Sequence, residues 1–379
     1  MLEDYRNKID EIDNEIARLL NERMLMSKAI GEEKAKSNTG VVDKNREKNI
    51  LNRVTKLVNP EYRVYTKLIY EMIFETSKAY QRQFICKESA IVSEIKQVLA
   101  SGVEKFPTSA TVACQGVQGA YSNLAAEKLF ELSDIIYLKT WEAVFDAVEK
   151  GFCEYGILPI ENSSAGSVMA VYDLMKKHNC YIVKSCKLRV QHHLLAKNGV
   201  KLQDIKEIVS HQQALDQCSE LINSLKGVKI TVCDNTAMAA KMVAESNRTD
   251  IACISSRECA NLYNLGIVES NIQNNDNNYT RFICISKKLQ IFENSNKISI
   301  MVTLPHEKGS LNKTLNKFSA LGLNLTKLES RPMPNTDFEF WFYFDFEANI
   351  KDEEVQKLIA EFDSGTEQFT FLGSYSEVM

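Results

Sequence analysis

Cationic side chains occupy positions near the start of the chain that should be apolar. From Leu2 to Ile30, apolar residues recur at three- and four-residue spacing, which predicts a long helix packed against other helices. Arg23 falls on that seam, where a lone arginine can reach out to solvent or fix the packing register. However, polar residues also interrupt the apolar faces of the next two predicted helices, at Arg46, Glu47, Ser77 and Gln81.

Such a cluster of polar groups predicts a binding site. Buried polar groups are costly unless they contact one another or a ligand. The cationic groups are in surplus, and they are Arg6, Arg23, Lys34 and Arg46. The pattern therefore favours an anionic ligand held among the helices.

A second set of polar motifs lies where predicted strands end, between residues 108 and 287. The runs are Gly116–Ser122, Glu161-Asn162-Ser163, Ser210-His211, Asn235-Thr236 and Asn278–Phe282. The glycine loop offers backbone amides to a carboxylate, with a simple strand–helix turn as the alternative, and Ser210 is the expected N-cap of a helix. Because α/β folds bind small molecules at strand ends and between lobes, these motifs predict one site.

The elements that must position these side chains change in type along the chain. Residues 1–88 are predicted as helices, and residues 89–107 as a linker that starts with a connecting helix. Residues 108–287 alternate strands with helices, and the stretch 181–195 is expected to cross between two lobes. Residues 297–376 follow the order β-α-β-β-α-β. The expected fold is multidomain: an all-α segment, a two-lobed α/β segment and a small α+β module.

One predicted strand of the last module alternates strictly. Its phenylalanines share one face, which should pack against helices: Phe338, Phe340, Phe342, Phe344 and Phe346. Trp341 and Tyr343 point to the other face, which is therefore expected to meet a second copy of the sheet.

Composition excludes several classes of protein. The 379 residues are 44% hydrophobic and 25% charged, as in soluble globular proteins of two or three domains. A net charge of −4 argues against nucleic acid or an anionic membrane as a partner, and no apolar run could span a bilayer. Ten cysteines without C-x-x-C spacing predict reduced, buried thiols and a cytoplasmic protein.

Metal and organic cofactors are not indicated. The adjacent His192 and His193 would point to opposite faces of a predicted strand, so they do not make a metal site alone. His178 and His306 have no partner in the sequence. No histidine–cysteine arrangement suggests a nucleophile.

The helical segment resembles the all-helical chorismate mutases. The resemblance rests on R-x-x-I-D-x-x-D-x-x-I-x-x-L-L-x-x-R from Arg6 to Arg23, on Val42-Asp43-x-x-Arg46-Glu47 and on Ser77-x-x-x-Gln81. It implies that three arginines bind the two carboxylates of chorismate, namely Arg6, Arg23 and Arg46. It further implies Lys34 and Gln81 at the ether oxygen, Glu47 at the ring hydroxyl, and Asp43 and Ser77 in support. An intertwined homodimer, with Arg6 entering the partner's site, is also implied.

The α/β segment resembles the prephenate dehydratases. The motifs G-x-x-G-x-[YF]-S, P-I-E-N-S-x-x-G-x-V, S-H-x-Q-A-L-x-Q-C and T-R-F occur in order, with departures at Val117, Gln212 and Asn235. The resemblance implies Thr280 as the principal catalytic group, assisted by Asn162, Ser210 and Gln217. The implied substrate-binding residues are Tyr121, Ser122, Glu161, Ser163, His211 and Arg281.

Individual roles stay open at three of these positions. Thr280 is too weak an acid to act as a tuned glutamate or histidine would, so we interpret it as a donor to the departing hydroxyl. Glu161 is a candidate for tuning that proton transfer. Arg281 either binds the substrate carboxylate or forms a structural ion pair, and His211 either positions substrate or makes a structural hydrogen bond.

The last module resembles an ACT domain that binds L-phenylalanine. The resemblance rests on its element order and on nine residues that would form the regulatory site: Gly309, Ser310, Leu311, Asn324, Leu325, Glu329, Ser330, Arg331 and Pro332. It implies feedback inhibition by L-phenylalanine at an interface between two such modules, in a homodimer or homotetramer.

Together the resemblances imply a bifunctional enzyme that isomerises chorismate to prephenate and converts prephenate to phenylpyruvate. One alternative is a dehydratase alone, with the helices serving only to dimerise the chain. Another is a two-lobed binding protein with a sensor module and no turnover.

Overall fold

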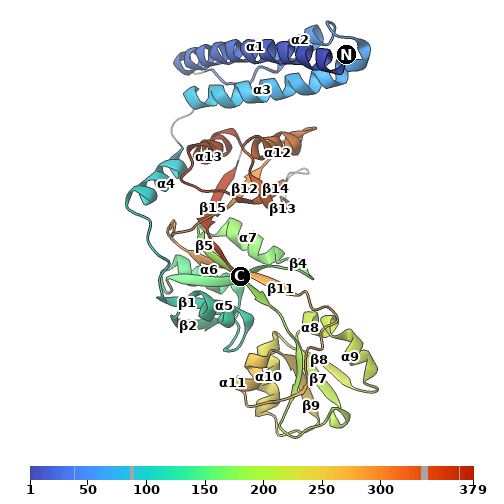
Figure 1. Cartoon of the computed structure of the whole chain (residues 1–379). Helices are drawn as coiled ribbons and strands as arrows, with labels where there is room; N and C mark the ends of the chain where they lie inside the picture. The colour runs from blue at the N-terminus through green and yellow to red at the C-terminus, as the bar shows by residue number, and fades with distance from the viewer. Residues whose placement is uncertain (38, 86–88, 334–339, 367) are drawn as a thin grey trace. The chain divides into compact units, whose positions relative to one another are not determined.

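The chain forms two compact units. The computed structural model describes residues 1–37, 39–85, 89–333, 340–366 and 368–379. One unit comprises Met1–Gln97 with Ile300–Phe371, and the other comprises Val98–Ser299 with Leu372–Met379 (Figure 1). In the described part of the chain, no helix has an apolar stretch long enough to cross a bilayer.

The N-terminal segment is helical, as predicted. Its elements are α1 (Leu2–Ser37), α2 (Lys44–Val54), the 3-10 helix η1 (Pro60–Tyr62), α3 (Arg63–Ile85) and α4 (Ala90–Ala100). Asp43 caps α2, because its carboxylate accepts a hydrogen bond of 2.8 Å from the backbone N–H of Arg46. Helices α1 and α3 approach closely at Gly31, where a Cβ would lie 3.2 Å from the Cα of Gln81.

The first lobe of the α/β unit is built on a mixed sheet in the order β16-β5-β11-β3-β1-β2, with β4 paired to β3. Its strands are β1 (Ser109–Gln115), β2 (Leu132–Leu138), β3 (Tyr155–Asn162), β4 (Gly166–Ser167), β5 (Tyr181–Arg189), β11 (Tyr279–Ser286) and β16 (Glu377–Val378). Its helices are α5 (Tyr121–Leu129), α6 (Trp141–Glu149) and α7 (Met169–Lys177). The core includes Val112, Phe130, Ile157 and Phe282.

The second lobe has a sheet in the order β10-β6-β9-β7-β8. Its strands are β6 (His193–Ala196), β7 (Glu207–Ser210), β8 (Lys229–Val232), β9 (Ile251–Ser255) and β10 (Gly266–Glu269). Its helices are η2 (Leu202–Asp204), α8 (Gln212–Gln217), α9 (Ser219–Ser224), α10 (Thr236–Glu245) and α11 (Arg257–Leu262). Strand β9 is buried throughout, which explains the apolar run from Ile251 to Ile254.

Two chain segments connect the lobes. Strand β5 belongs to the first sheet and β6 to the second, so the chain crosses at residues 190–192, inside the stretch predicted to do so. It returns between β10 and β11, through residues 270–278. Polar side chains on these crossings can therefore contact both lobes.

The C-terminal module has the predicted β-α-β-β-α-β order. Its elements are β12 (Lys297–Thr303), α12 (Ser310–Ala320), β13 (Asn324–Pro332), β14 (Phe340–Glu347), α13 (Glu353–Gly365) and β15 (Phe369–Tyr375), with sheet order β13-β14-β12-β15. Phe344 and Phe346 are buried and contact the ring of Phe318, as their shared face predicts. Phe338 lies outside the described residues.

The opposite face of β14 carries Trp341 and Tyr343, as the alternation predicts. These two side chains are 4% and 3% exposed in the single chain. Contact of this face with a second copy of the sheet stays a prediction. Strict alternation places side chains on two faces but says nothing about what covers either one.

Candidate active sites

Thr280 and Asn162 form the centre of the site at the strand ends of the first lobe. They face each other in the register of β11 and β3. Asn162 is buried, and its Nδ2 donates to Thr280 Oγ1 at 2.9 Å and to Asn278 Oδ1 at 2.8 Å. Because Asn162 Nδ2 is a donor, Thr280 Oγ1 accepts this bond and keeps its own proton for another acceptor.

The turn after β3 fixes the orientation of Asn162. Its Oδ1 accepts hydrogen bonds from the backbone N–H groups of Ser164, at 3.0 Å, and Ala165, at 2.8 Å. Ser163 Oγ donates to the carbonyl of Asn277 at 2.9 Å and accepts from the N–H of Tyr279, also at 2.9 Å. The turn is thereby attached to the segment that leads into Thr280.

Gln217 joins the same cluster from helix α8 of the second lobe. Its Oε1 lies 3.1 Å from Asn278 Nδ2 and 2.9 Å from His192 Nε2. Hydrogen bonds thus connect five side chains that we call the lobe-spanning network: Thr280, Asn162, Asn278, Gln217 and His192. Two of its members sit on the crossing segments.

The sequence did not assign roles to His192 and Asn278. Asn278 lies within the quoted motif before Thr280, and His192 lies in the stretch predicted to cross between lobes. Both signals were present, but their contacts join residues that are 25 to 116 positions apart. Only the folded chain brings these residues together.

Ser210 lies outside the network and does not cap α8. Its side chain is fully buried, and its hydroxyl donates to the carbonyl of Ile254 in β9 at 2.7 Å. Ser210 remains in strand β7, so His211 becomes the N-cap, with its Nδ1 accepting from the N–H of Gln213 at 3.3 Å. The structural hydrogen bond considered for His211 is therefore present.

The glycine loop between β1 and α5 uses most of its amides within the protein. The N–H groups of Gly116, Gly119 and Ala120 donate to Leu138 O, Asn123 Oδ1 and Val117 O, respectively. The Tyr121 hydroxyl bonds the backbone of Gln191 on the crossing segment, and burial raises its pKa. Ser122 is buried. These contacts favour the strand–helix turn over a carboxylate cradle.

Arg281 forms the ion pair that was one of its two interpretations. Consecutive residues of a strand point to opposite faces, so Arg281 faces away from Thr280. It is 4% exposed, with Nη1 3.3 Å from Glu161, Nε 2.8 Å from Glu377 and Nη2 2.6 Å from the Tyr375 hydroxyl. Burial alone would raise the pKa of Glu377, but ion pairs with Lys297 and Arg281 lower it to about 2.

In the helical segment, Arg23 and Ser77 come together between α1 and α3. The Arg23 guanidinium bonds the hydroxyl of Ser77 and lies 5.9 Å from the ring centre of Phe74. Burial lowers the pKa of Arg23. Gln81 is 8% exposed, and among the described residues its Oε1 has no hydrogen-bond partner. Arg23 therefore contacts the polar face of α3 instead of reaching out to solvent.

The remaining mutase candidates have other contacts in the single chain. Lys34 Nζ donates to the carbonyl of Val41 at 2.8 Å, and Glu47 forms an ion pair of 3.1 Å with Lys78. Arg46 and Arg6 are exposed. One chain thus assembles only part of the predicted cluster.

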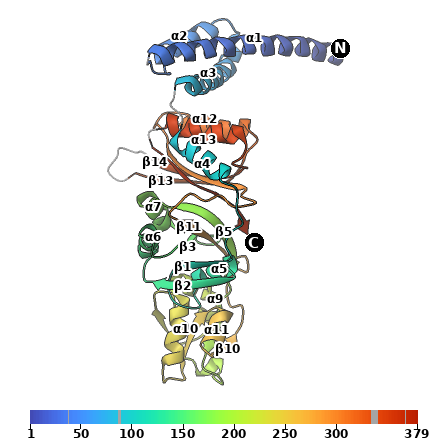
Figure 2. The ribbon, with the colours of Figure 1, turned by 90° about the vertical axis from the view of Figure 1, so that its left-hand side faces the viewer.

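The seam of α1 is uncovered over its N-terminal half. Figure 2 shows this part of α1 extending past α2 and α3. The exposed fractions of its apolar side chains range from 49% to 66%, for Leu2, Tyr5, Ile9, Ile12, Ile16 and Leu19. A seam of this length is typical of a helix that packs against another chain.

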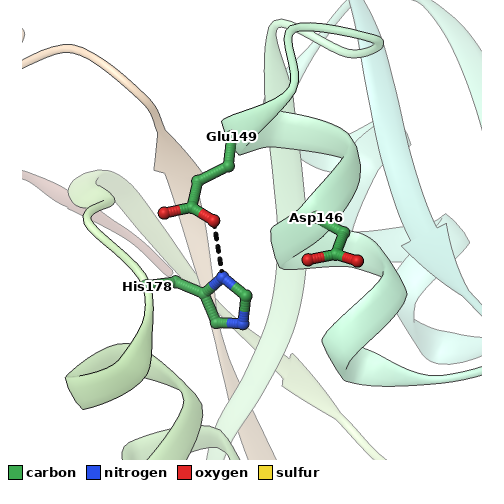
Figure 3. Close-up of side chains that lie close together, drawn as sticks. All are labelled: Asp146, Glu149 and His178. Carbon is green, nitrogen blue, oxygen red and sulfur yellow. Dashed lines mark hydrogen bonds and ion pairs between the residues drawn. The ribbon is translucent and has the colours of Figure 1, made fainter.

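Asp146, Glu149 and His178 form a separate cluster between α6 and the end of α7 (Figure 3). His178 is buried, and its Nδ1 lies 2.8 Å from Glu149, which also accepts from the N–H of Asn179. Lys150 forms an ion pair of 3.0 Å with Asp146. The sequence offered no partner for His178, and the structure supplies Glu149. The contacts are those of a tether between two helices.

The cysteines match their prediction. The nine described cysteines carry free thiols, of which eight are buried. Burial raises the pKa of Cys218, the one within a motif, to about 12. Such thiols are protonated at neutral pH and do not serve as nucleophiles.

The fold is a two-lobed α/β unit with a candidate site at its strand ends, in a chain that also carries a helical segment. Residues 112–290 match the prephenate dehydratase family, and residues 5–82 match the chorismate mutase type II family. A bifunctional chorismate mutase/prephenate dehydratase of Aquifex aeolicus is 30% identical over 380 residues, spanning 100% of this chain and 98% of that protein. The chain belongs to the family of bifunctional chorismate mutase/prephenate dehydratases.

Two further relatives each match about 70% of the chain. A chloroplastic arogenate dehydratase/prephenate dehydratase of Arabidopsis thaliana is 38% identical over 276 residues, covering 70% of this chain and 72% of that protein. A prephenate dehydratase of Arthrobacter aurescens, solved in complex with L-Phe, has 27% identity and a TM-score of 0.63. That match covers 70% of this chain and 90% of the other.

Proposed function

We propose that this chain rearranges chorismate to prephenate in its helical segment and converts prephenate to phenylpyruvate in its α/β unit. The observation that carries the second step is the hydrogen bond from Asn162 to Thr280, which leaves the Thr280 proton free. Membership in the bifunctional family supports both steps.

In the dehydration, Thr280 donates its proton to the C4 hydroxyl of prephenate as that group leaves. The ring carboxylate departs as CO2, and its bonding electron pair enters the ring and expels the hydroxyl as water. The products are phenylpyruvate, CO2 and water, and solvent restores the Thr280 proton. Aromatisation supplies the driving force, so a weakly acidic but well-positioned donor suffices.

In the rearrangement, the protein positions its substrate and stabilises charge. A [3,3] shift needs no nucleophile or cofactor, only the enolpyruvyl arm held over the ring with donors at the ether oxygen. Arg23, Arg46 and a partner's Arg6 bind the carboxylates of chorismate. Lys34 and Gln81 donate to the oxygen whose bond breaks, which requires Gln81 to turn its amide nitrogen toward the ligand. Glu47 accepts from the ring hydroxyl.

The mutase site requires a second copy of the chain. The exposed seam of α1 and the distance along α1 between Arg6 and Arg23 support an intertwined homodimer. Seventeen residues of helix separate the two arginines by about 25 Å, too far for both to clamp one small molecule from the same helix. The partner's Arg6 therefore completes each site.

The C-terminal module is proposed to bind L-phenylalanine and to inhibit dehydration. The candidate residues lie at the start of α12, where Gly309 has a φ of 85°, and along the edge strand β13. An effector changes activity only if it binds one state of the protein better than another. The relative from Arthrobacter aurescens, solved with L-Phe, is consistent with this role.

The test is a time course of the purified chain fed with chorismate, with and without L-phenylalanine. Transient prephenate followed by phenylpyruvate, slowed by L-phenylalanine, is the expected result. Unconsumed chorismate would remove the mutase assignment and leave a dehydratase with a dimerisation segment. Feeding prephenate and arogenate in parallel decides between the two substrates that occur in the name of the Arabidopsis relative.

A further inference from the structure

The lobe-spanning network has a hydrogen-bond direction that two backbone groups determine. The N–H groups of Ser164 and Ala165 both donate to Asn162 Oδ1, so the amide nitrogen of Asn162 must point the other way. That nitrogen donates to Asn278 Oδ1, which turns Asn278 Nδ2 toward Gln217 Oε1. The orientation of each amide is thus fixed by the one before it.

The last hydrogen bond in this series, between Gln217 and His192, determines the tautomer of His192. Gln217 Oε1 can only accept, and it lies 2.9 Å from His192 Nε2, so Nε2 carries the proton. His192 is 3% exposed, and burial lowers its pKa, which keeps the ring neutral. Among the described residues, the Nδ1 atom has no hydrogen-bond partner.

These bonds also decide which atoms of Gln217 face a ligand. Both hydrogen bonds of Gln217 in the network go to its Oε1, one from Asn278 and one from His192. Its NH2 group has no protein acceptor in the described part of the chain and is left to donate to prephenate. Without His192, Oε1 keeps only the donor from Asn278, and the amide is held less firmly in this orientation.

We propose that His192, as the neutral Nε2–H tautomer, is a positioning residue of dehydration that holds the Gln217 amide with its NH2 group toward prephenate. The inference rests on the proposed role of Gln217 beside Thr280. His192 does not contact the reacting atoms and acts through Gln217. Its place on the crossing segment also makes this orientation depend on both lobes.

Two substitutions distinguish the contribution of the Nε2–H hydrogen bond from that of the imidazole ring. In the full chain, His192→Asn removes the donor at the Nε2 position, whereas the amide nitrogen of His192→Gln reaches it. We expect kcat for prephenate to fall about 10- to 100-fold in His192→Asn, with KM within about threefold, and to recover largely in His192→Gln. The matched control is His193→Asn, which keeps an acceptor for the N–H of Asn271 and should retain dehydratase activity.

Chorismate consumption by the same variants reports whether the helical segment is folded, and the activity of His192→Gln reports whether the two-lobed unit tolerates a substitution at this position. Equal loss in His192→Asn and His192→Gln, or no loss in His192→Asn, overturns the proposal. If Thr280→Val stays active, the proposed site itself is wrong, whatever the His192 variants show.

A measurement on the unsubstituted chain tests the tautomer without relying on the activity of any variant. The chain has five histidines, so a 15N-histidine-labelled sample gives a simple spectrum of ring nitrogens. We expect the His192 signals of an Nε2–H tautomer, assigned by their loss in His192→Gln. The Nδ1–H tautomer, or a doubly protonated ring at neutral pH, contradicts the proposal.

Discussion

The helical segment and the two-lobed unit position their polar side chains in different ways. In the two-lobed unit, β3, β11, α8 and two crossing segments bring the five members of the network together within one chain. In the helical segment, Arg23 and Ser77 are joined, but Arg6 and Arg46 are exposed and the α1 seam is open. The first cluster forms within a single chain, whereas a single chain assembles only part of the second.

The difference follows from the geometry of the two folds. A sheet places residues from distant parts of a chain at one strand end, so a single α/β unit can surround a small ligand. A few helices bury only one stripe each, and a charged position on that stripe needs further helices around it. Dehydration should therefore be insensitive to dissociation of the chains, whereas the rearrangement should depend on it.

The largest effect is expected from a substitution of Thr280, in the candidate site of the two-lobed unit. Replacing Thr280 by the isosteric valine removes the hydroxyl whose proton is available to the substrate. The dehydratase kcat should therefore fall about 10²- to 10⁴-fold. Assays with prephenate and chorismate would measure this, and chorismate consumption should remain within about twofold. Thr280→Ser keeps a hydroxyl and should recover most of the activity. A fully active Thr280→Val would rule out Thr280 as the donor.

Arginine variants address the shared site. Arg23→Ala should lower mutase activity about 10²- to 10³-fold, because the guanidinium proposed to bind a carboxylate of chorismate is lost. Arg6→Ala should do the same, although Arg6 is exposed in one chain. Both variants should keep their dehydratase activity, which serves as the control for folding.

Mixing the two inactive variants sharpens the comparison. After exchange of subunits, half of the dimers would pair one variant with the other and hold one intact site, so about a quarter of the mutase activity should return. Chorismate consumption before and after exchange measures this. No recovery in a mixture shown to exchange would mean that Arg6 acts within its own chain.

A substitution on the α1 seam tests the same contrast without touching a proposed ligand contact. Ile12 is 50% exposed in one chain, and Ile12→Glu would bury a charge in the proposed dimer interface. We expect dissociation in sedimentation and loss of mutase activity at low protein concentration, with dehydratase activity unchanged. Glu11→Gln is the neighbouring control off the seam. A stable dimer of Ile12→Glu with full mutase activity would contradict the proposed interface.

Sequence patterns predicted the parts of both sites that depend on local order. The order of strands and helices and the strand-end motifs around Asn162 and Thr280 followed from periodicity and turn residues. The N-cap at Ser210 was wrong, because β7 extends one residue further and His211 takes the position. A choice between adjacent polar residues depends on where the strand ends.

What the sequence could not predict involves contacts between distant segments. The link from Gln217 to His192 and Asn278 depends on how two crossing segments approach α8. What covers Trp341 is equally open to the sequence, since alternation identifies a face and not its cover. In both cases the residue types were visible, and only their partners were not.

The smallest expected effect on activity concerns the C-terminal end of the chain, where Glu377 joins the first sheet of the two-lobed unit. Glu377 has its pKa lowered from 4.5 to about 2, so its charge stabilises the fold above pH 4.5 and this contribution is lost as the pH falls toward 2. Glu377→Gln should lower the free energy of unfolding at pH 7 by about 3 kcal/mol.

Trp141 lies in α6 of this unit, so its fluorescence in a Trp341→Phe background would follow urea unfolding there. The exposed carboxylate of Glu293 provides the control, Glu293→Gln, which should unfold like the parent. Because Glu377 pairs with Arg281 on the face of β11 opposite to Thr280, the variant should lose stability while its dehydratase kcat stays within about twofold. Equal stability of Glu377→Gln and its parent at pH 7 would show that the ion pairs only offset the cost of burying them, whereas a large fall in kcat would place Arg281 at the substrate after all.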